Sequence, residues 1–242
     1  MPSVPNDGRL SAMTLELWAQ ILKWALVALA VLMMTGQCRK PRWWLGRRMA
    51  RVMNIQHSGV TDWGLGHVRI GKQFTILDVG CGGGRTIEKL ATAANEGKVY
   101  GIDYSPASVA VAQTTNAQSI GAGRVDIRQG SVSRLPFPDE SFDVVTAVET
   151  HYYWPNLVDD MREILRVLKP GGKLAIIAET YKGRRLDLVY RPVMMLLRAT
   201  YLTPDEHRYA LSAAGYVDVE VSEERGKGWI CAVGAKPRTR AV

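Results

Sequence analysis

A nearly apolar run that ends in a cluster of glycines constrains this chain more than any other feature. Phe74–Val79 reads FTILDV, and four glycines follow within the next five residues. A run without polar alternation is typical of a strand buried on both faces of a parallel sheet. Glycines directly after such a strand let the backbone turn tightly and approach a ligand closely. The stretch predicts a strand, a ligand-facing turn and a helix, which open an α/β domain.

The rest of the chain alternates between strand and helix patterns. The expected strands are Phe74–Val79, Val99–Ile102, Val125–Gln129, Phe142–Val148, Lys173–Ala178, Val217–Val221 and Trp229–Val233. Helical spacing of apolar residues or a cap-and-proline start marks the intervening helices, and a further helix is expected over Tyr181–Tyr201. This order predicts a doubly wound α/β fold with a seven-stranded sheet. Because no helix separates the last two strands, one of them is expected to run antiparallel.

The spacing of the glycines excludes two common phosphate-binding loops. A P-loop needs a lysine followed by a hydroxyl residue, and none follows here. A dinucleotide loop has glycine at the sixth position, where this chain has Arg85 or Ile87 depending on the register. The pattern present is Asp78-x-Gly80-x-Gly82-x-Gly84, with Asp103 closing the second strand.

That pattern resembles motif I of class I S-adenosylmethionine-dependent methyltransferases. Four further stretches resemble later family motifs in the same order: YGIDYS, QGSVSRLPF, LPFPDESFDVVTAVET and ILRVLKPGGKL. The resemblance covers roughly residues 53 to 237. It implies a Rossmann-like doubly wound seven-stranded sheet with one antiparallel strand, and S-adenosyl-L-methionine as the cofactor.

The resemblance also implies a set of cofactor-binding residues. They lie in the glycine loop, at the end of the second strand and after the third strand: Asp78, Gly80, Cys81, Gly82, Gly84, Asp103, Tyr104, Ser131 and Val132. Asp103 is expected to take the ribose hydroxyls, and Tyr104 to lie along the adenine. The family often has an acid at the position of Ser131, so the amide of Val132 is an alternative contact there.

Candidate catalytic residues follow the fourth strand, where ligands meet an open α/β sheet. Glu149 falls where related small-molecule methyltransferases carry a glutamate near the methionine amine and the acceptor. His151 is a candidate general base, or else a hydrogen-bonded wall residue. Tyr152 and its aromatic neighbours either cage a cationic acceptor or pack the rim.

Two flanking segments are further candidates for contact with the site. Before the first strand, His57, Asp62, Trp63 and His67 either approach the cofactor or belong to a plain helix. After the fifth strand, the apolar cluster around Met194 either lines an acceptor pocket or packs in the core.

The N-terminal region predicts association with a membrane. Residues 17 to 35 are almost entirely apolar, and this length just reaches the roughly 20 residues that cross a bilayer. A basic run from Arg39 to Arg51 follows, with Trp43 and Trp44 inside it. A spanning helix, an interfacial helix and a core helix all remain open. We expect a hydrophobic helix over 1–36, a basic juxtamembrane segment over 37–53, a methyltransferase domain over 54–237 in the cytoplasm, and a tail over 238–242.

The charge distribution disfavours nucleic acid as a partner. The net charge is +8, but six arginines and lysines of the basic run account for most of it and leave +2 elsewhere. Three cysteines without metal-ligand spacing predict neither a disulfide framework nor a metal site. A small, lipophilic acceptor is therefore expected, with the oligomeric state open. The alternatives are a membrane-recruited cofactor-binding module without turnover, and transfer of another group from a related sulfonium.

Overall fold

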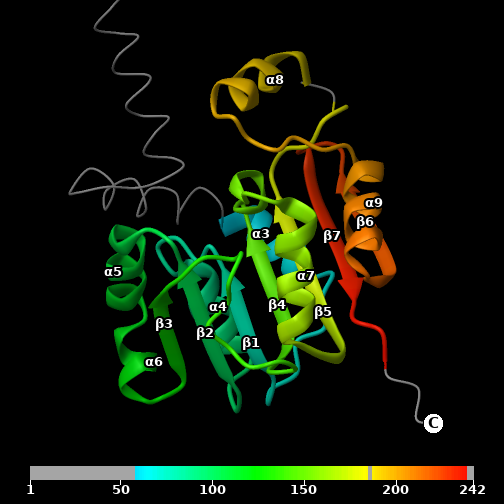
Figure 1. The fold of residues 1–242 in the computed structure, drawn as a ribbon. Coiled ribbons are helices and arrows are strands. Elements are labelled where there is room, and N and C mark those ends of the chain that lie inside the picture. Colours follow the sequence, from blue (N-terminus) through cyan, green and yellow to red (C-terminus); the bar gives the residue numbers. More distant parts are fainter. Residues whose placement is uncertain (1–57, 185–186, 239–242) are drawn as a thin grey trace, which may run out of the picture.

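A seven-stranded sheet forms the centre of the protein (Figure 1). The computed structural model describes residues 58–184 and 187–238. The strand order is β3-β2-β1-β4-β5-β7-β6. The strands are β1 (Thr75–Val79), β2 (Lys98–Asp103), β3 (Val125–Gln129), β4 (Phe142–Val148), β5 (Leu168–Ala178), β6 (Val217–Glu224) and β7 (Trp229–Ala235). β7 runs antiparallel to both β5 and β6, while the pairs among β1 to β5 are parallel. The predicted sheet with one antiparallel strand is confirmed.

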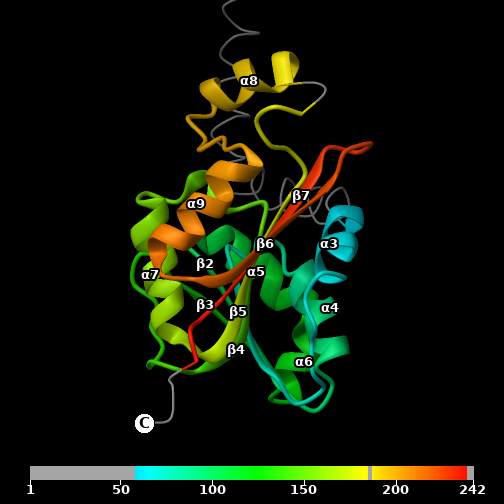
Figure 2. The same ribbon diagram turned by 90° about the vertical axis from the view of Figure 1, so that its right-hand side faces the viewer.

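Helices cover both faces of the sheet (Figure 2). They are α3 (Ser58–Leu65), α4 (Arg85–Ala93), α5 (Pro106–Thr115), α6 (Ala117–Gly121), α7 (Leu157–Val167), α8 (Asp187–Leu196) and α9 (Pro204–Ala214), with a 3₁₀ turn, η1 (His151–Tyr153). One buried cluster joins α3, α4 and α5 to one face, and a second joins α7 and α9 to the other. β1 is buried on both faces: Ile76 and Leu77 are inaccessible to solvent and belong to opposite clusters. Each such side chain stabilises the fold by about 1.5–3 kcal/mol.

Local sequence signals set the ends of several helices as expected. Ser105 caps α5 and accepts a hydrogen bond from the amide of Ser108. Thr203 and Glu206 form a reciprocal capping box at the start of α9, and Gly215 ends that helix in the left-handed conformation. These contacts satisfy amides and carbonyls that a helix terminus leaves unpaired.

The structure differs from the sequence-based expectation at β5. This strand begins at Leu168 and not at Lys173, because Leu168 pairs with Phe142 and both side chains are fully buried. The pairing then shifts register before Lys173 meets Val144. The Pro170-Gly171-Gly172 stretch is therefore an irregular part of the strand and does not precede it.

The helix expected over Tyr181–Tyr201 is shorter than predicted. Only Asp187–Leu196 is helical, and Arg198, just beyond it, has a positive φ of 51°. The expected membrane-associated helix and basic segment lie before Ser58, outside the described residues. Within residues 58–184 and 187–238, no helix has both the length and the hydropathy that crossing a bilayer requires.

Candidate active site

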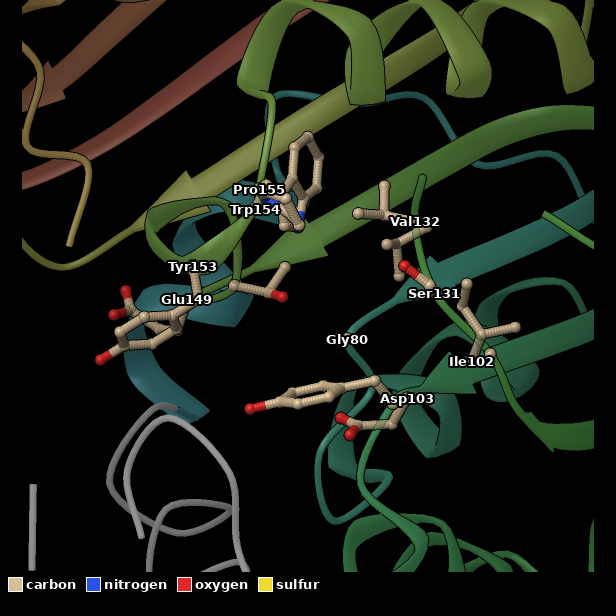
Figure 3. A pocket seen from close by; sticks show the side chains of 13 residues that line it. Gly80, Ile102, Asp103, Ser131, Val132, Glu149, Tyr153, Trp154 and Pro155 are labelled. Atoms are coloured by element: carbon tan, nitrogen blue, oxygen red, sulfur yellow. The ribbon is translucent and has the colours of Figure 1, made fainter. Parts of the chain in front are cut away.

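A cavity of about 310 Å³ opens at the carboxyl ends of the parallel strands. Its wall combines residues that follow β1, β2, β3 and β4, as expected for a ligand site in an open α/β sheet. Asp103, Ile102, Ser131 and Val132 lie at one end, and Glu149 and Tyr153 lie at the other, with Gly80 between them (Figure 3). The side chains of Asp103 and Ser131 on one side of the glycine loop, and those of Glu149 and Tyr153 on the other, thus line the same cavity.

The glycine loop is held against β2 by its own backbone. The amides of Gly80 and Cys81 both donate to the carbonyl oxygen of Ile102, at 2.8 and 2.9 Å. Gly80 has φ +72°, and a Cβ placed on it would lie 2.1 Å from Oγ1 of Thr150. Only glycine fits at this position, since both the conformation and the neighbouring side chain exclude a larger residue.

The other two predicted loop glycines have different surroundings, and neither lines the cavity. Gly84 has φ +83°, and a Cβ there would lie 2.8 Å from the Cα of Ala112 on α5. The side chain of Asn116 also donates to the carbonyl of Gly84, at 2.9 Å. Gly84 therefore permits close packing between α4 and α5, whereas Gly82 faces open space and donates its amide to Asp103.

Asp103 is fixed by two backbone amides. Its Oδ1 accepts from Ser105 at 2.8 Å and its Oδ2 accepts from Gly82 at 2.9 Å. The residue is only 7% exposed, and burial raises the pKa of its carboxyl, while the two amide bonds counteract that rise. Each carboxylate oxygen has a second lone pair, so this carboxylate can still accept two hydroxyl groups from a ligand in the cavity.

Asp78 lies beneath the loop and is absent from the cavity wall. Its carboxylate accepts a 2.6 Å hydrogen bond from the hydroxyl of Thr146 on β4. Burial raises the pKa of Asp78 to about 7, and the negative charge of Asp103 acts in the same direction. The structure thus gives Asp78 a position from which it supports the loop.

Cys81 also points away from the cavity. Its side chain is 6% exposed and packs in the cluster that contains Ile87. Burial raises the pKa of this thiol well above its ordinary value, with Asp103 and Asp78 adding to the effect, so the thiol stays protonated. The part of Cys81 that can contribute at the loop is its backbone.

Tyr104, Ser131 and Val132 line the cavity at the end near Asp103. The hydroxyl of Ser131 accepts from the amide of Ser133 at 3.3 Å, within a small turn closed by a bridge between Ser131 and Arg134. Val132 is buried, and Tyr104 is 39% exposed. The sequence-predicted residues at this end are thus brought together from two strands.

Glu149 occupies the opposite end in an unusual backbone conformation. Its φ is +57°, a backbone angle that residues other than glycine adopt only at a cost in free energy. Its Oε1 accepts from the amide of Glu179, so the side chain joins the carboxyl ends of β4 and β5. This bond holds the carboxylate at the cavity wall, beside Thr150 and Tyr153.

His151 and Tyr152, the other predicted catalytic residues, do not lie on the cavity wall. His151 is inaccessible to solvent, and its Nε2 lies 3.3 Å from Nε2 of His207 on α9. The hydroxyl of Tyr152 donates to the carbonyl of Thr180 at 3.0 Å. The η1 turn directs both rings into the interior, so the role expected for His151 as a base does not fit its position.

The two buried histidines form a directed hydrogen-bonded pair. Nδ1 of His207 lies 2.8 Å from the carbonyl of Thr203 and must donate to it, so Nε2 of a neutral His207 accepts from His151. Burial lowers the pKa of both rings, and His207 lowers that of His151 further. Nδ1 of His151 has no hydrogen-bond partner among the described residues.

The segment before β1 packs elsewhere. Asp62 forms an ion pair with Lys89, and Trp63 packs against Trp229 and His67. None of these residues lines the cavity, and His57 lies outside the described range.

Sequence reasoning missed Gly130 and Pro155 on the wall of the cavity. The available signal was their position directly beside predicted wall residues.

The strand order, the loop after β1 and the acid that ends β2 define an α/β protein that binds a nucleoside-containing cofactor. The methyltransferase domain family matches residues 77–176. The uncharacterized methyltransferase YdaC of Bacillus subtilis is 27% identical over 190 residues, which are 78% of this chain and 97% of that protein. The demethylmenaquinone methyltransferase of Geobacillus stearothermophilus is 32% identical over 179 residues, covering 64% of this chain and 75% of the relative.

Two further comparisons agree. The 27-O-demethylrifamycin SV methyltransferase of Amycolatopsis mediterranei is 39% identical over 101 residues, which cover 42% of this chain and 37% of the relative. Among solved structures, an S-adenosylmethionine-dependent methyltransferase from Aquifex aeolicus has the same fold, with a TM-score of 0.63, 21% identity, and coverage of 78% of this chain and 98% of that one. The chain belongs to the class I S-adenosylmethionine-dependent methyltransferases. It is an enzyme whose cofactor is S-adenosylmethionine.

Proposed function

We propose that this enzyme methylates a small, lipophilic molecule at the cytoplasmic face of a membrane. The observation that carries the proposal is a single cavity with an acid-bearing end at Asp103 and an aromatic end at Tyr153 and Trp154. Two of the relatives are named for small-molecule acceptors, a demethylated menaquinone and a demethylated rifamycin. The apolar residues 17 to 35 and the basic run after them favour a membrane location.

We assign the cofactor to the Asp103 end of the cavity. Asp103 would accept the two ribose hydroxyls, because its oxygens keep free lone pairs beside their backbone bonds. Tyr104 and the Ser131–Val132 turn would hold the adenine, and Gly80, which has no side chain of its own, would border the methionine end beside Thr150. S-adenosylmethionine held in this way would supply an activated methyl group to the part of the cavity that Glu149 lines.

Methyl transfer from a sulfonium is an in-line displacement. A lone pair of the acceptor forms the new bond to the methyl carbon, and the electrons of the broken C–S bond return to sulfur as a neutral thioether. Because the leaving group is good, alignment of the acceptor and exclusion of water dominate, and they contribute up to about 7–11 kcal/mol in favourable cases. The buried Trp154 and the half-buried Tyr153 supply that enclosure.

We assign Glu149 to the acceptor end as the ionisable group nearest the reaction. A neutral acceptor loses a proton during transfer, and a positioned carboxylate accelerates such a step by about 10²–10⁴-fold. Glu149 lines the cavity and is held there by its bond to the amide of Glu179. His151 has neither property, since it lies in the interior against His207.

The direct test supplies methyl-labelled S-adenosylmethionine and a lipid extract to the full-length protein. We expect label in a small, organic-soluble product, and loss of that product in Asp103→Ala. The matched control is Asp126→Ala, which removes an acid from the neighbouring strand that pairs only with Arg128 in the described contacts. Cofactor binding without any labelled product, or label found only in protein or nucleic acid, would overturn the proposal.

A further inference from the structure

Helix α8 carries an apolar surface that nothing in the described structure covers. Leu188 is 88% exposed, Met195 73% and Leu196 53%. Val189 and Val193 are also exposed, so five of the eight large exposed hydrophobic residues in the described part of the chain lie in this one helix of ten residues. Exposed apolar surface concentrated in this way marks a contact site.

The exposed residues form one stripe along the helix. Leu188, Pro192, Met195 and Leu196 stand at i, i+4, i+7 and i+8, which places them on a common face. Met194 points the other way: it is 6% exposed and packs with Tyr152, Tyr181 and Ile230. The helix is thus anchored by Met194, and the ribbon of α8 stands clear of the sheet beyond the carboxyl ends of the parallel strands (Figures 1 and 2).

The charges around the stripe select its partner. Between Asp187 and Asp205 the sequence contains no acidic residue, while Arg191 and Arg198 are both exposed. An apolar face bordered by arginines, without acids, is the composition of a helix that lies in the headgroup region of an anionic bilayer. A soluble apolar partner would not require this bias in charge.

Helix α8 lies at the same edge of the sheet as α3, the first helix of the described chain. Helix α3, with which the described chain begins, packs on the same edge: a Cβ on Gly59 would touch Trp229, and one on Gly64 would touch Ile177, near the end of β5. The loop that carries α8 leaves the sheet at the end of that same strand. The sequence before α3 contains the apolar stretch 17–35, for which a membrane location is proposed above.

We propose that α8 inserts its Leu188–Leu196 stripe into the interfacial layer of an anionic membrane. This placement rests on the proposed function and specifies how the acceptor arrives. Met194 of α8 belongs to one buried cluster with Tyr152; Tyr153 packs against that cluster and lines the cavity. The amide of Thr200, just beyond α8, donates to the carbonyl of Tyr152 at 2.8 Å. A helix lying in lipid therefore borders the acceptor end, and the acceptor enters from the membrane.

The test measures lipid contact at α8 in the full-length protein. In a Cys38→Ser background the two other cysteines are buried, so Met195→Cys can be labelled selectively with bimane. Vesicles of equal parts phosphatidylglycerol and phosphatidylcholine, containing a lipid with a nitroxide on its acyl chain, should quench this bimane at least about threefold. The matched control is Tyr209→Cys on α9, which is 75% exposed and should be quenched little.

Each outcome decides the proposal. Quenching that weakens in Arg191→Gln/Arg198→Gln, or in vesicles of phosphatidylcholine alone, supports it. Equal quenching at positions 195 and 209, or none at 195, overturns it. So does bimane emission already shifted to the blue without vesicles, because the stripe is then covered by another part of this chain or a second copy. Quenching without a labelled methyl product would retain α8 as a membrane helix and remove the proposed function. A labelled methyl product without quenching at position 195 would retain the proposed function and remove the membrane contact of α8.

Discussion

The two ends of the cavity are built by different means. At the Asp103 end, backbone groups fix the geometry: the amides of Gly82 and Ser105 hold the carboxylate, and the carbonyl of Ile102 holds the loop. At the Glu149 end, one backbone amide, that of Glu179, holds the carboxylate, while the wall around it consists of aromatic side chains. Tyr153 belongs to η1 and packs against the buried cluster that contains Met194 of α8. A backbone frame suits a ligand that never changes, and a side-chain frame can vary with the acceptor.

The largest effect is expected where a new side chain would break the backbone frame. Gly80→Ala places a methyl group against Thr150 in a conformation disfavoured for alanine, and should weaken cofactor binding by roughly 100-fold, as about 3 kcal/mol implies. Isothermal titration with S-adenosylmethionine measures this. Gly123→Ala is the matched control, since Gly123 has the same φ of +72° but open space around it. An equal loss in both variants would mean that backbone strain alone is responsible.

Removal of the carboxylate at the same end should have the next largest effect. Asp103→Ala deletes the acceptor for two amides and for the ribose hydroxyls, and a charged hydrogen-bonding group of this kind contributes roughly 10- to 100-fold in affinity. The same titration, with Asp126→Ala as control, provides the measurement. Unchanged affinity at a preserved melting temperature would contradict the placement of the ribose.

A change at the acceptor end should separate chemistry from cofactor binding. Glu149→Gln keeps an oxygen that can accept from Glu179 but loses the negative charge, so we expect kcat to fall by about 100-fold and cofactor affinity to stay within about threefold. Steady-state kinetics with the labelled product gives kcat. Glu220→Gln, on exposed strand β6, is the control. A large loss of cofactor affinity would instead place Glu149 at the methionine amine.

The buried histidine pair predicts a loss of stability in acid. The pKa values of His151 and His207 are lowered in the folded state, so below about pH 6.5 the unfolded chain takes up protons that the folded chain refuses. The free energy of unfolding should therefore fall from pH 6.5 downward, by at most about 1.4 kcal/mol per pH unit for each histidine. Urea denaturation at a series of pH values measures this slope. The negative charge of Glu206 acts in the opposite direction to burial and raises the pKa of His207.

The variant His207→Asn should reduce that slope, because it removes one of the two buried imidazoles. If His151 were the catalytic base, His207→Asn would shift the pH optimum of kcat. We expect no such shift, since His151 faces the interior.

The smallest expected effect concerns Asp78. Its pKa is raised to about 7 by burial, so its stabilising contribution is complete below its ordinary pKa, declines as the pH rises, and is lost once the pH has passed about 7. Asp78→Asn should therefore raise the melting temperature of the cofactor-free protein at pH 8 by roughly 2–4 °C, which corresponds to about 1 kcal/mol. The gain should shrink toward pH 5. A melting temperature lowered at pH 8 would contradict the cost assigned to this buried charge.

The sequence predicted the backbone-built part of the molecule far better than the rest. All seven strands follow from apolar runs and turn residues, because these encode burial directly, and one of the last two strands was expected to run antiparallel; the structure identifies it as β7. Asp103 and Gly80 could be placed since they end strands whose carboxyl ends meet at one edge. The direction of His151 could not, because a 3₁₀ turn rotates successive side chains by an amount that residue types do not encode.

The contact between Thr150 and Gly80 gives the two ends a shared boundary. The threonine side chain occupies the volume that any substituent on the glycine would need, so the first loop and the fourth-strand loop interlock at that point. Redesign of acceptor choice through position 150 would thus alter the seat of the cofactor's amino-acid portion as well. Larger residues at position 150 would compress the glycine loop, and smaller ones would loosen it. Substitutions intended to change the acceptor should therefore disturb the cofactor site less at Tyr153 than at position 150.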